Sequence, residues 1–295
     1  MLIPAHPLRA EISTGQLLPE ALAALQIDNV QLASVKAAIY DPQSGTMIYD
    51  KYSDVQAPIA SITKLMTALV VMESGVSLEE YLEVRAYKKI SSKNAYSRIR
   101  VGSQLRRKDL LRLALMASEN LAADNLAQHH PGGSKAFVKA MNDKALALGM
   151  TSTHFVGPTG LSLGNVSTAG DLVKLVVAAS AYPLIGEYST TTRYTARFRK
   201  PSYSLYYGNT NRLVHRHSWQ IGLSKTGYLN EAGRCLVLLS DIDGIPVVMV
   251  LLDSFGKLSP IGDAGRVKRW ITTGRGGKVA GAALNYERSK TAQLD

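Results

Sequence analysis

A serine and a lysine three residues apart open the most apolar helical stretch of the chain. Ser61 and Lys64 lie in segment 57–75, in which Pro58 breaks the preceding structure and Gly75 is placed to cap the helix end. Positions i and i+3 share one helix face, so the Lys64 amine can reach the Ser61 hydroxyl. The helix is apolar nearly all round and is expected to be buried, which lowers the pKa of Lys64 towards its neutral, basic form. A serine beside such an amine is a candidate nucleophile.

Two further short motifs carry polar groups that suit the same chemistry. Ser118-Glu-Asn120 follows a predicted helix at 109–116, and Lys225-Thr-Gly227 closes a predicted strand at 221–226. Each motif alone is weak or moderately specific. Together, in this order, on helix, loop and strand and with first residues 57 and 107 positions apart, they are a strong signal.

The three motifs resemble those of the penicillin-recognising serine enzymes. Segments 58–67, 155–162 and 225–234 look like those of the low-molecular-mass D-alanyl-D-alanine peptidases. Segments 232–237 and 252–256 are most similar to the D,D-endopeptidase branch, the penicillin-binding protein 7 type. The resemblance covers roughly residues 30–285 and extends well beyond the motifs.

The resemblance implies a role for each motif residue. Ser61 would attack the carbonyl after a D-alanine, Lys64 would act as its base, and Ser118 would relay a proton to the leaving amine. The residues expected to bind substrate are Asn120, Lys225, Thr226, Gly227 and Tyr228. Among them, Thr226 would bind a carboxylate, and the backbone N–H groups of Ser61 and Tyr228 would form the oxyanion hole.

The implied reaction is hydrolysis of peptidoglycan peptide stems through an acyl-enzyme, with β-lactam antibiotics as covalent inhibitors. Carboxypeptidase and endopeptidase activities use the same residues, so the motifs do not separate them. The resemblance favours the endopeptidase, which cuts D-alanyl-diaminopimelate cross-links, with the carboxypeptidase as the alternative. A periplasmic location follows from where this substrate lies. The N-terminus shows no secretory signal, so a removed signal peptide is assumed.

Other functional classes fit less well. A β-lactamase of the most similar kind would carry a Glu-x-x-Leu-Asn stretch, which does not occur here, and a non-catalytic penicillin sensor is usually fused to a membrane-spanning signalling part. A metallopeptidase would need a third ligand beside His129-His130 or His215-x-His217, and none has motif spacing. No metal or other cofactor is therefore expected.

The composition points to an anionic partner but not to nucleic acid. The chain has 295 residues, 46% of them hydrophobic, and a formal net charge of +11. The basic residues form scattered short clusters without a nucleic-acid-binding module, so a solvated basic surface and attraction to a carboxylate-rich polymer remain open. The apolar run 65–72 is too short to span a bilayer, and no transmembrane segment is expected. The single cysteine, Cys235, is expected to be buried, whereas Glu119 is expected to point to solvent.

The order of predicted elements favours an α+β fold of the serine β-lactamase/D,D-peptidase-like type. An antiparallel sheet would be built from N- and C-terminal segments and flanked by helices, with a mostly helical lobe inserted between them. We expect a single D,D-peptidase (transpeptidase-like) domain, 1–295, with a sheet lobe at about 30–60 and 190–275 and a helical lobe at about 61–189.

A few segments outside these main elements carry expectations of their own. A helical piece is expected at 19–25, a turn at 102–106, and frayed structure over the last twenty residues. The Tyr- and Arg-rich stretch 188–207 is either a groove for glycan strands or a hairpin with exposed aromatic edges.

Overall fold

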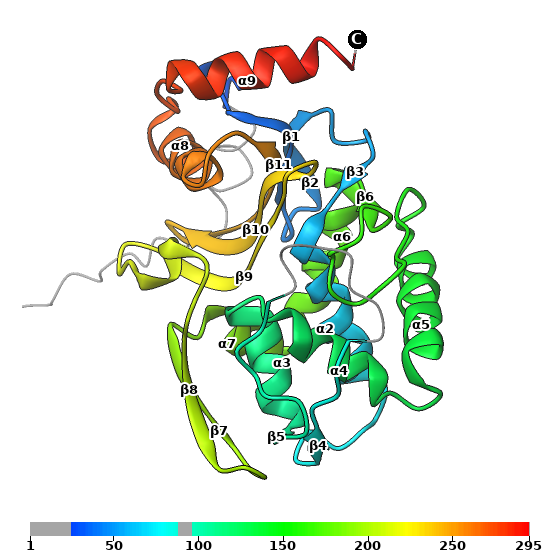
Figure 1. The fold of residues 1–295 in the computed structure, drawn as a ribbon. Coiled ribbons are helices and arrows are strands. Elements are labelled where there is room, and N and C mark those ends of the chain that lie inside the picture. Colours follow the sequence, from blue (N-terminus) through cyan, green and yellow to red (C-terminus); the bar gives the residue numbers. More distant parts are fainter. Residues whose placement is uncertain (1–24, 88–95, 295) are drawn as a thin grey trace, which may run out of the picture.

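A five-stranded antiparallel sheet forms one end of the molecule in the computed structural model, which describes residues 25–87 and 96–294 (Figure 1). The strand order is β2-β1-β11-β10-β9, so the first two strands of the chain pair with the last three. The bounds are β1 (Ser34–Asp41), β2 (Thr46–Lys51), β9 (Gln220–Leu229), β10 (Gly233–Ile242) and β11 (Ile245–Ser254). The predicted fold class, with its sheet drawn from both ends of the chain, is confirmed.

The central strands are apolar on both faces because both faces are covered. In β11, Val247, Met249 and Leu251 point to one side, and Val248 and Val250 point to the other. One set packs with α8 (Ser259–Thr273), and the other packs with α6 (Ala169–Ser180). A strand buried on both faces reads as a continuous apolar run, which is why the sequence marks β10 and β11 so clearly.

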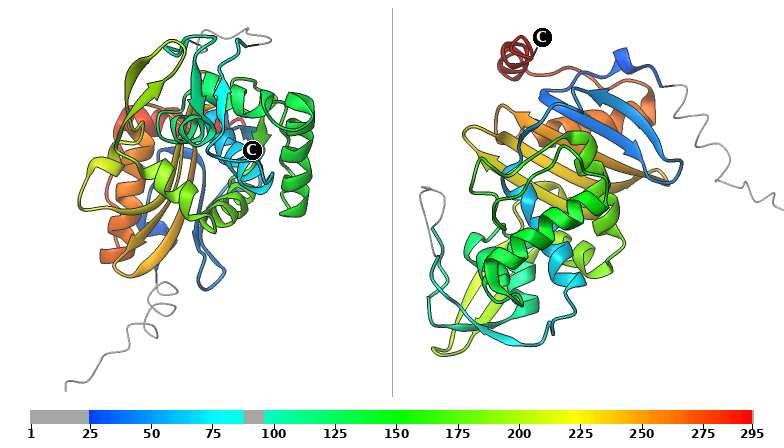
Figure 2. Two further views of the ribbon diagram at one scale, coloured as in Figure 1. Left: turned by 90° about the horizontal axis from the view of Figure 1, so that it is seen from below. Right: turned by 90° about the vertical axis from the view of Figure 1, so that its right-hand side faces the viewer.

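Most of the helices lie on the side of the sheet that packs with α6 (Figures 1 and 2). The buried helix α2 (Thr63–Glu73) contacts its helical neighbours on several sides, so it has no polar face. The remaining helical segments are η1 (Ile27–Asn29), η2 (Ala60–Ile62), α3 (Arg107–Met116), α4 (Asn120–Gln128), α5 (Gly133–Ala147), α7 (Pro183–Thr190), η3 (Arg212–His215) and α9 (Gly281–Thr291).

Three strand pairs lie outside the main sheet. They are β3 (Ala57–Pro58) with β6 (Val166–Ser167), β4 (Tyr81–Glu83) with β5 (Gln104–Arg106), and β7 (Arg193–Phe198) with β8 (Tyr203–Gly208). The last pair is a hairpin that projects from the helical part, at the lower left of Figure 1. Stretch 188–207 therefore includes a hairpin, one of the two structures that its sequence allowed.

Two local expectations were wrong, and one falls outside the description. The turn expected at 102–106 contains β5, a strand too short to show a period of its own. The last twenty residues, which were expected to be frayed, contain α9. An ion pair of 2.7 Å between Lys51 and Glu287 holds this helix to the sheet. The helical piece expected at 19–25 lies outside the described residues except for its last position.

Within the described ranges, no single helix has both the length and the apolar composition to cross a membrane. Only α6 and α7 taken together pass that test, as a pair bent by 106°.

Candidate active site

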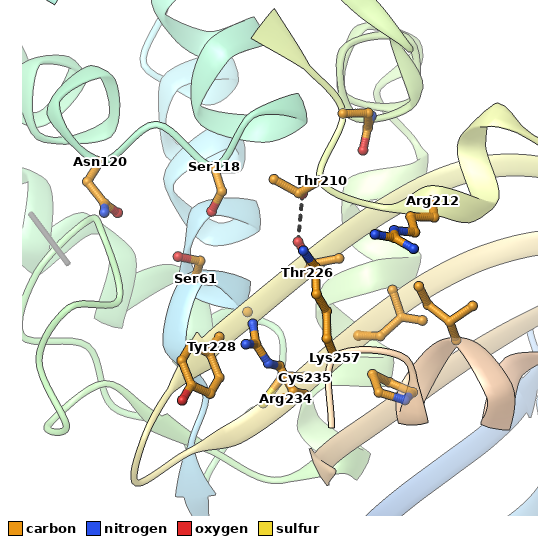
Figure 3. Close-up of a pocket in the computed structure, with 15 residues that line it drawn as sticks. Ser61, Ser118, Asn120, Thr210, Arg212, Thr226, Tyr228, Arg234, Cys235 and Lys257 are labelled. Atoms are coloured by element: carbon orange, nitrogen blue, oxygen red, sulfur yellow. Dashed lines mark hydrogen bonds between the residues drawn. The ribbon is translucent and has the colours of Figure 1, made fainter. Parts of the chain in front are cut away.

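Ser61 lies where the edge of the sheet meets the buried helix. It is the middle residue of η2, which leads directly into α2 (Figure 3). Ala60 has a φ of 47°, a left-handed conformation that is unfavourable for a residue with a Cβ. A Cβ on Gly160 would lie 1.9 Å from the carbonyl oxygen of Ala60, so only glycine fits against this turn. The close packing fixes the backbone that carries Ser61.

Lys64 is fully buried, and its amine has three oxygen neighbours. The Nζ atom lies 2.8 Å from Oγ of Ser61, 2.7 Å from Oδ1 of Asn120 and 2.6 Å from the carbonyl oxygen of Thr159. The oxygens of Asn120 and Thr159 can only accept hydrogen bonds. A neutral amine has two N–H donors and one lone pair, so it would donate to those two oxygens and present its lone pair to the Ser61 hydroxyl. This is the arrangement of a base aimed at a serine.

The electrostatic surroundings favour the neutral form of Lys64. Burial lowers the pKa of Lys64 well below its usual value of 10.5, and the charge of Lys225 lowers it further, whereas Glu119 raises it. Lys64 also lies in the first turn of α2, where the helix dipole disfavours a positive charge. Burial, which the sequence had indicated, is the largest of the causes.

A second lysine–serine pair faces the first. Lys225 on β9 is 1% exposed, and its Nζ donates to Oγ of Ser118 at 3.0 Å and to the carbonyl oxygen of Thr226 at 2.8 Å. Burial lowers the pKa of Lys225 to about 7. Ser118 lies in the turn between α3 and α4 with a φ of 57°. Ser118, which the sequence predicts to relay a proton, therefore has its hydroxyl bonded to Lys225.

These groups surround one pocket of about 440 Å³ (Figure 3). Six of the eight predicted site residues line it: Ser61, Ser118, Asn120, Thr226, Gly227 and Tyr228. The other two, Lys64 and Lys225, are buried and bonded to the two serines of its wall. The structure therefore brings all eight together, and their individual roles stay predictions.

The edge strand β9 runs close beside the serine turn. A Cβ on Gly227 would lie 3.1 Å from the carbonyl oxygen of Ile59 and 3.2 Å from the backbone nitrogen of Ser61. Tyr228 follows at the pocket mouth, 39% exposed, and the guanidinium of Arg234 stacks 3.5 Å from the centre of its ring. Gly227 thus allows a close approach to the serine turn as well as the predicted approach to substrate.

Glu119 is not directed to solvent as expected. Its side chain is half-buried and accepts a hydrogen bond of 3.2 Å from the N–H of Leu121, which makes it the N-cap of α4. Burial raises the pKa of Glu119, and its hydrogen bonds oppose that shift. A carboxylate directly before a helix start is well placed to cap it, and this signal was available in the sequence.

Several pocket groups were missed by the sequence argument. The carbonyl of Thr159 carries no residue-type signature, although it lies in the glycine-containing loop 155–164. Thr210 places its hydroxyl 2.6 Å from that of Thr226, and Arg212 and Lys257 line the far side of the pocket (Figure 3). These three residues lie in loops or short turns, where no periodic pattern marks them.

The histidine pairs lie away from this pocket. His129 contacts the carbonyl oxygen of Glu83 at 2.8 Å, and His215 and His217 are exposed. Within residues 25–87 and 96–294, no group of three or more His, Cys, Asp or Glu is placed to hold a metal ion.

Comparison with known families agrees with this geometry. The family model described as D-alanyl-D-alanine carboxypeptidase matches residues 23–256, a span that includes all three motifs. The chain belongs to this peptidase family. It is a serine-type D-Ala-D-Ala peptidase.

Two similar proteins carry a more specific description. A D-alanyl-D-alanine endopeptidase of Escherichia coli is 49% identical over 279 residues, which cover 95% of this chain and 90% of that protein. One of Pseudomonas aeruginosa is 50% identical over 256 residues, covering 87% and 83%. The resemblance to the endopeptidase type of penicillin-binding protein is confirmed.

Solved structures agree on the fold. The Streptomyces K15 DD-transpeptidase matches with a TM-score of 0.75 at 28% identity, over 88% of this chain and 99% of that one. Penicillin-binding protein D2 from Listeria monocytogenes, in its ampicillin-bound form, matches with a TM-score of 0.71 at 29% identity, over 83% and 99%.

Proposed function

We propose that the chain is a periplasmic serine D,D-endopeptidase that hydrolyses D-alanyl-diaminopimelate cross-links of peptidoglycan and is inhibited by β-lactams. The observation that carries the proposal is the contact between Lys64 and Ser61, in which two acceptor-only oxygens direct the amine at the hydroxyl. The names of the two relatives near 50% identity support the endopeptidase assignment. The periplasm follows from the position of the substrate in the cell wall.

Acylation begins with proton transfer from Ser61 to neutral Lys64. The serine oxygen forms a bond to the D-alanine carbonyl carbon, and the carbonyl oxygen takes up negative charge. The backbone N–H groups of Ser61 and Tyr228 and the N-terminus of α2 stabilise that charge. The tight turn around Ser61 contributes by fixing the hydroxyl before the substrate arrives.

The cross-link then breaks at its C–N bond. The proton held by Lys64 passes to the leaving amine through Ser118, whose hydroxyl is hydrogen-bonded to Lys225. Water next attacks the acyl-enzyme while Lys64 accepts a proton from that water. Return of this proton to the serine oxygen releases the product and restores the starting state.

Substrate binding uses the opposite wall of the pocket. Thr226 directs its hydroxyl into the pocket, where it would bind the carboxylate beside the leaving amine. Lys225, behind it, adds positive potential while protonated. Asn120 would bind a substrate amide in addition to fixing Lys64.

The far side of the pocket favours a cross-linked substrate over a single stem. The pocket wall also carries three cations, Arg212, Arg234 and Lys257. A second peptide stem brings further carboxylates past the leaving amine, and these cations complement them. A free D-alanine leaving group, as in the carboxypeptidase alternative, would not reach so far.

A comparison of two soluble substrates tests the proposal. The native enzyme and Ser61→Ala are each given a purified cross-linked muropeptide dimer and a monomeric pentapeptide. We expect kcat/KM to be at least about tenfold higher for the dimer, a difference of about 1.4 kcal/mol, and no turnover by Ser61→Ala. Preference for the monomer would assign the carboxypeptidase instead, and turnover by Ser61→Ala would reject the mechanism.

A further inference from the structure

Part of the positive charge of the chain lies in a long segment without acidic residues. Residues 188–230 contain no Asp or Glu and seven Lys or Arg. A segment whose charged side chains are all positive attracts anions through their summed electrostatic potential.

Much of this segment forms the projecting hairpin β7–β8, residues 193–208, which we call the arm (Figures 1 and 2). One face of the arm is apolar, and Ala196, Phe198 and Tyr207 are buried there. The opposite face is exposed and polar. Its residues are Arg193, Thr195 and Arg197 on β7, with Lys200 in the connecting turn and Tyr206 on β8.

The arm is held in place by the chain beside it. Arg98 donates to the carbonyl oxygen of Tyr206 at 2.7 Å, and the backbone N–H of Arg100 donates to the hydroxyl of Tyr203 at 3.0 Å. Near the turn, Arg199 stacks 3.6 Å from the centre of the Tyr81 ring. The exposed cations are thus displayed on a fixed support, so binding an anion costs little ordering of the backbone.

The exposed arm cations have no acidic partner among the residues that the structure describes. Arg193, Arg197 and Lys200 make no ion pair there, whereas Lys139 and Lys174 on helices pair with nearby carboxylates. Their charge is available to an external ligand.

The arm is continuous with the active-site pocket. Strand β8 ends at Gly208, and Thr210 and Arg212 directly after it line the pocket together with Ser61. The backbone N–H of Thr210 donates to the carbonyl oxygen of Met116 at 3.0 Å, which ties the base of the arm to the end of α3. The base of the arm therefore adjoins the wall of the pocket.

We propose that the arm is a docking surface for the carboxylate-bearing peptide stems of peptidoglycan, separate from the pocket that cuts them. Guanidinium groups bind carboxylates through paired hydrogen bonds, and the exposed ring of Tyr206 offers a flat contact between two arginines. Tyr206 is the one large apolar side chain exposed on the arm in the described structure, so the surface has little to insert into a bilayer. The inference rests on the proposed function because it takes the same polymer as the ligand.

A charge-matched pair of variants tests the arm. The arm variant is Arg193→Gln/Arg197→Gln/Lys200→Gln. The control, Lys135→Gln/Arg275→Gln/Lys278→Gln, removes three exposed cations elsewhere that also make no ion pair in the described structure. Both are made in the Ser61→Ala background, and binding is measured by co-sedimentation with purified insoluble peptidoglycan at low ionic strength. The active forms are assayed on the soluble muropeptide dimer.

We expect the arm variant to bind the polymer about tenfold more weakly than its parent, and the control to stay within about twofold. The parent should lose binding when the polymer carboxylates are converted to amides. Cleavage of the soluble dimer should stay within about twofold in both variants, because the substitutions leave the pocket intact.

Three results would overturn the proposal. They are equal affinity of the arm and control variants, unchanged binding to the amidated polymer, or equally tight binding of the parent to vesicles of anionic phospholipid. Failure of the native enzyme to cleave the dimer would refute the proposed function instead. The binding comparison uses inactive protein and still decides the role of the arm in that case.

Discussion

Two lysines are buried at the same pocket, and each is bonded to a serine, yet their surroundings differ. Lys64 contacts Ser61 and two oxygens that can only accept, from Asn120 and Thr159. Lys225 contacts Ser118 and a single carbonyl oxygen, from the residue that follows it.

Burial alone therefore does not decide whether a lysine amine can accept a proton from a neighbouring serine. It lowers the pKa of both amines, but only for Lys64 do two acceptors use both N–H groups of the neutral form and leave the lone pair for a serine. Lys225, with a pKa of about 7, changes charge near neutral pH, and its charge lowers the pKa of Lys64. We propose that the first amine acts as the base and that the second adjusts it and fixes Ser118.

Removing the base should have the largest effect. Lys64→Met keeps the length of the side chain but has no lone pair to accept the Ser61 proton. The second-order rate of acylation by benzylpenicillin should fall by about 10³-fold, within the usual range for loss of a general base. Lys36→Met, at another buried lysine, is the control and should stay within about threefold. Equal losses in the two variants would mean that any buried lysine is needed for folding rather than for chemistry.

Removing the second lysine should cost less. Lys225→Met should lower kcat/KM on the muropeptide dimer by about 10²-fold, because it removes positive potential and releases Ser118. Ser118→Ala should give a similar loss, and the double variant should be little worse than either, since the two groups share one hydrogen bond. Fully additive losses would contradict the pairing of these residues.

The pH below which acylation slows should shift in opposite directions in two variants. Acylation needs neutral Lys64, so its rate should fall as the pH drops through the lowered pKa of that amine. Glu119→Gln removes a charge that raises this pKa, so the acid limb should move to lower pH. Lys225→Met removes a charge that lowers it, so the limb should move to higher pH.

The rate profile of benzylpenicillin acylation measures both shifts, with Glu231→Gln, an exposed acid after β9, as the control. If both variants kept the native limb, a group other than Lys64 would control acylation.

The smallest effect is expected at the far wall of the pocket. Thr210→Val keeps the shape of the side chain but removes the hydroxyl that lies 2.6 Å from Thr226. A neutral hydrogen bond contributes roughly 1 kcal/mol, so kcat/KM on the dimer should fall about three- to fivefold, mainly through KM. Thr210→Ser should retain native values. Impairment by Ser with native values in Val would show that the methyl group, not the hydroxyl, matters.

The residues that the structure brings together at the pocket were largely predictable from the sequence. Ser61 and Lys64 share a helix face by spacing alone, and the paired apolar runs at β10 and β11 indicate the sheet that carries Lys225. The three motifs together then predicted that residues far apart in the chain form one site.

The features that could not be predicted from the sequence depend on backbone atoms and on long-range contacts. The carbonyl of Thr159, which helps to direct Lys64, is a group that every residue has. Helix α9 is polar enough to read as a frayed end, but the hydroxyl of Tyr286 donates to Asp253 at 2.7 Å and helps to fix it to the sheet. Such contacts link residues that no local pattern connects.

The central claim is that Ser61 is the nucleophile served by Lys64, and intact-protein mass after incubation with benzylpenicillin tests it most directly. The account predicts one antibiotic mass per native chain, located on the peptide that contains Ser61, and no adduct on Ser61→Ala. An adduct that persists on Ser61→Ala, or a native chain that is never acylated, would contradict it.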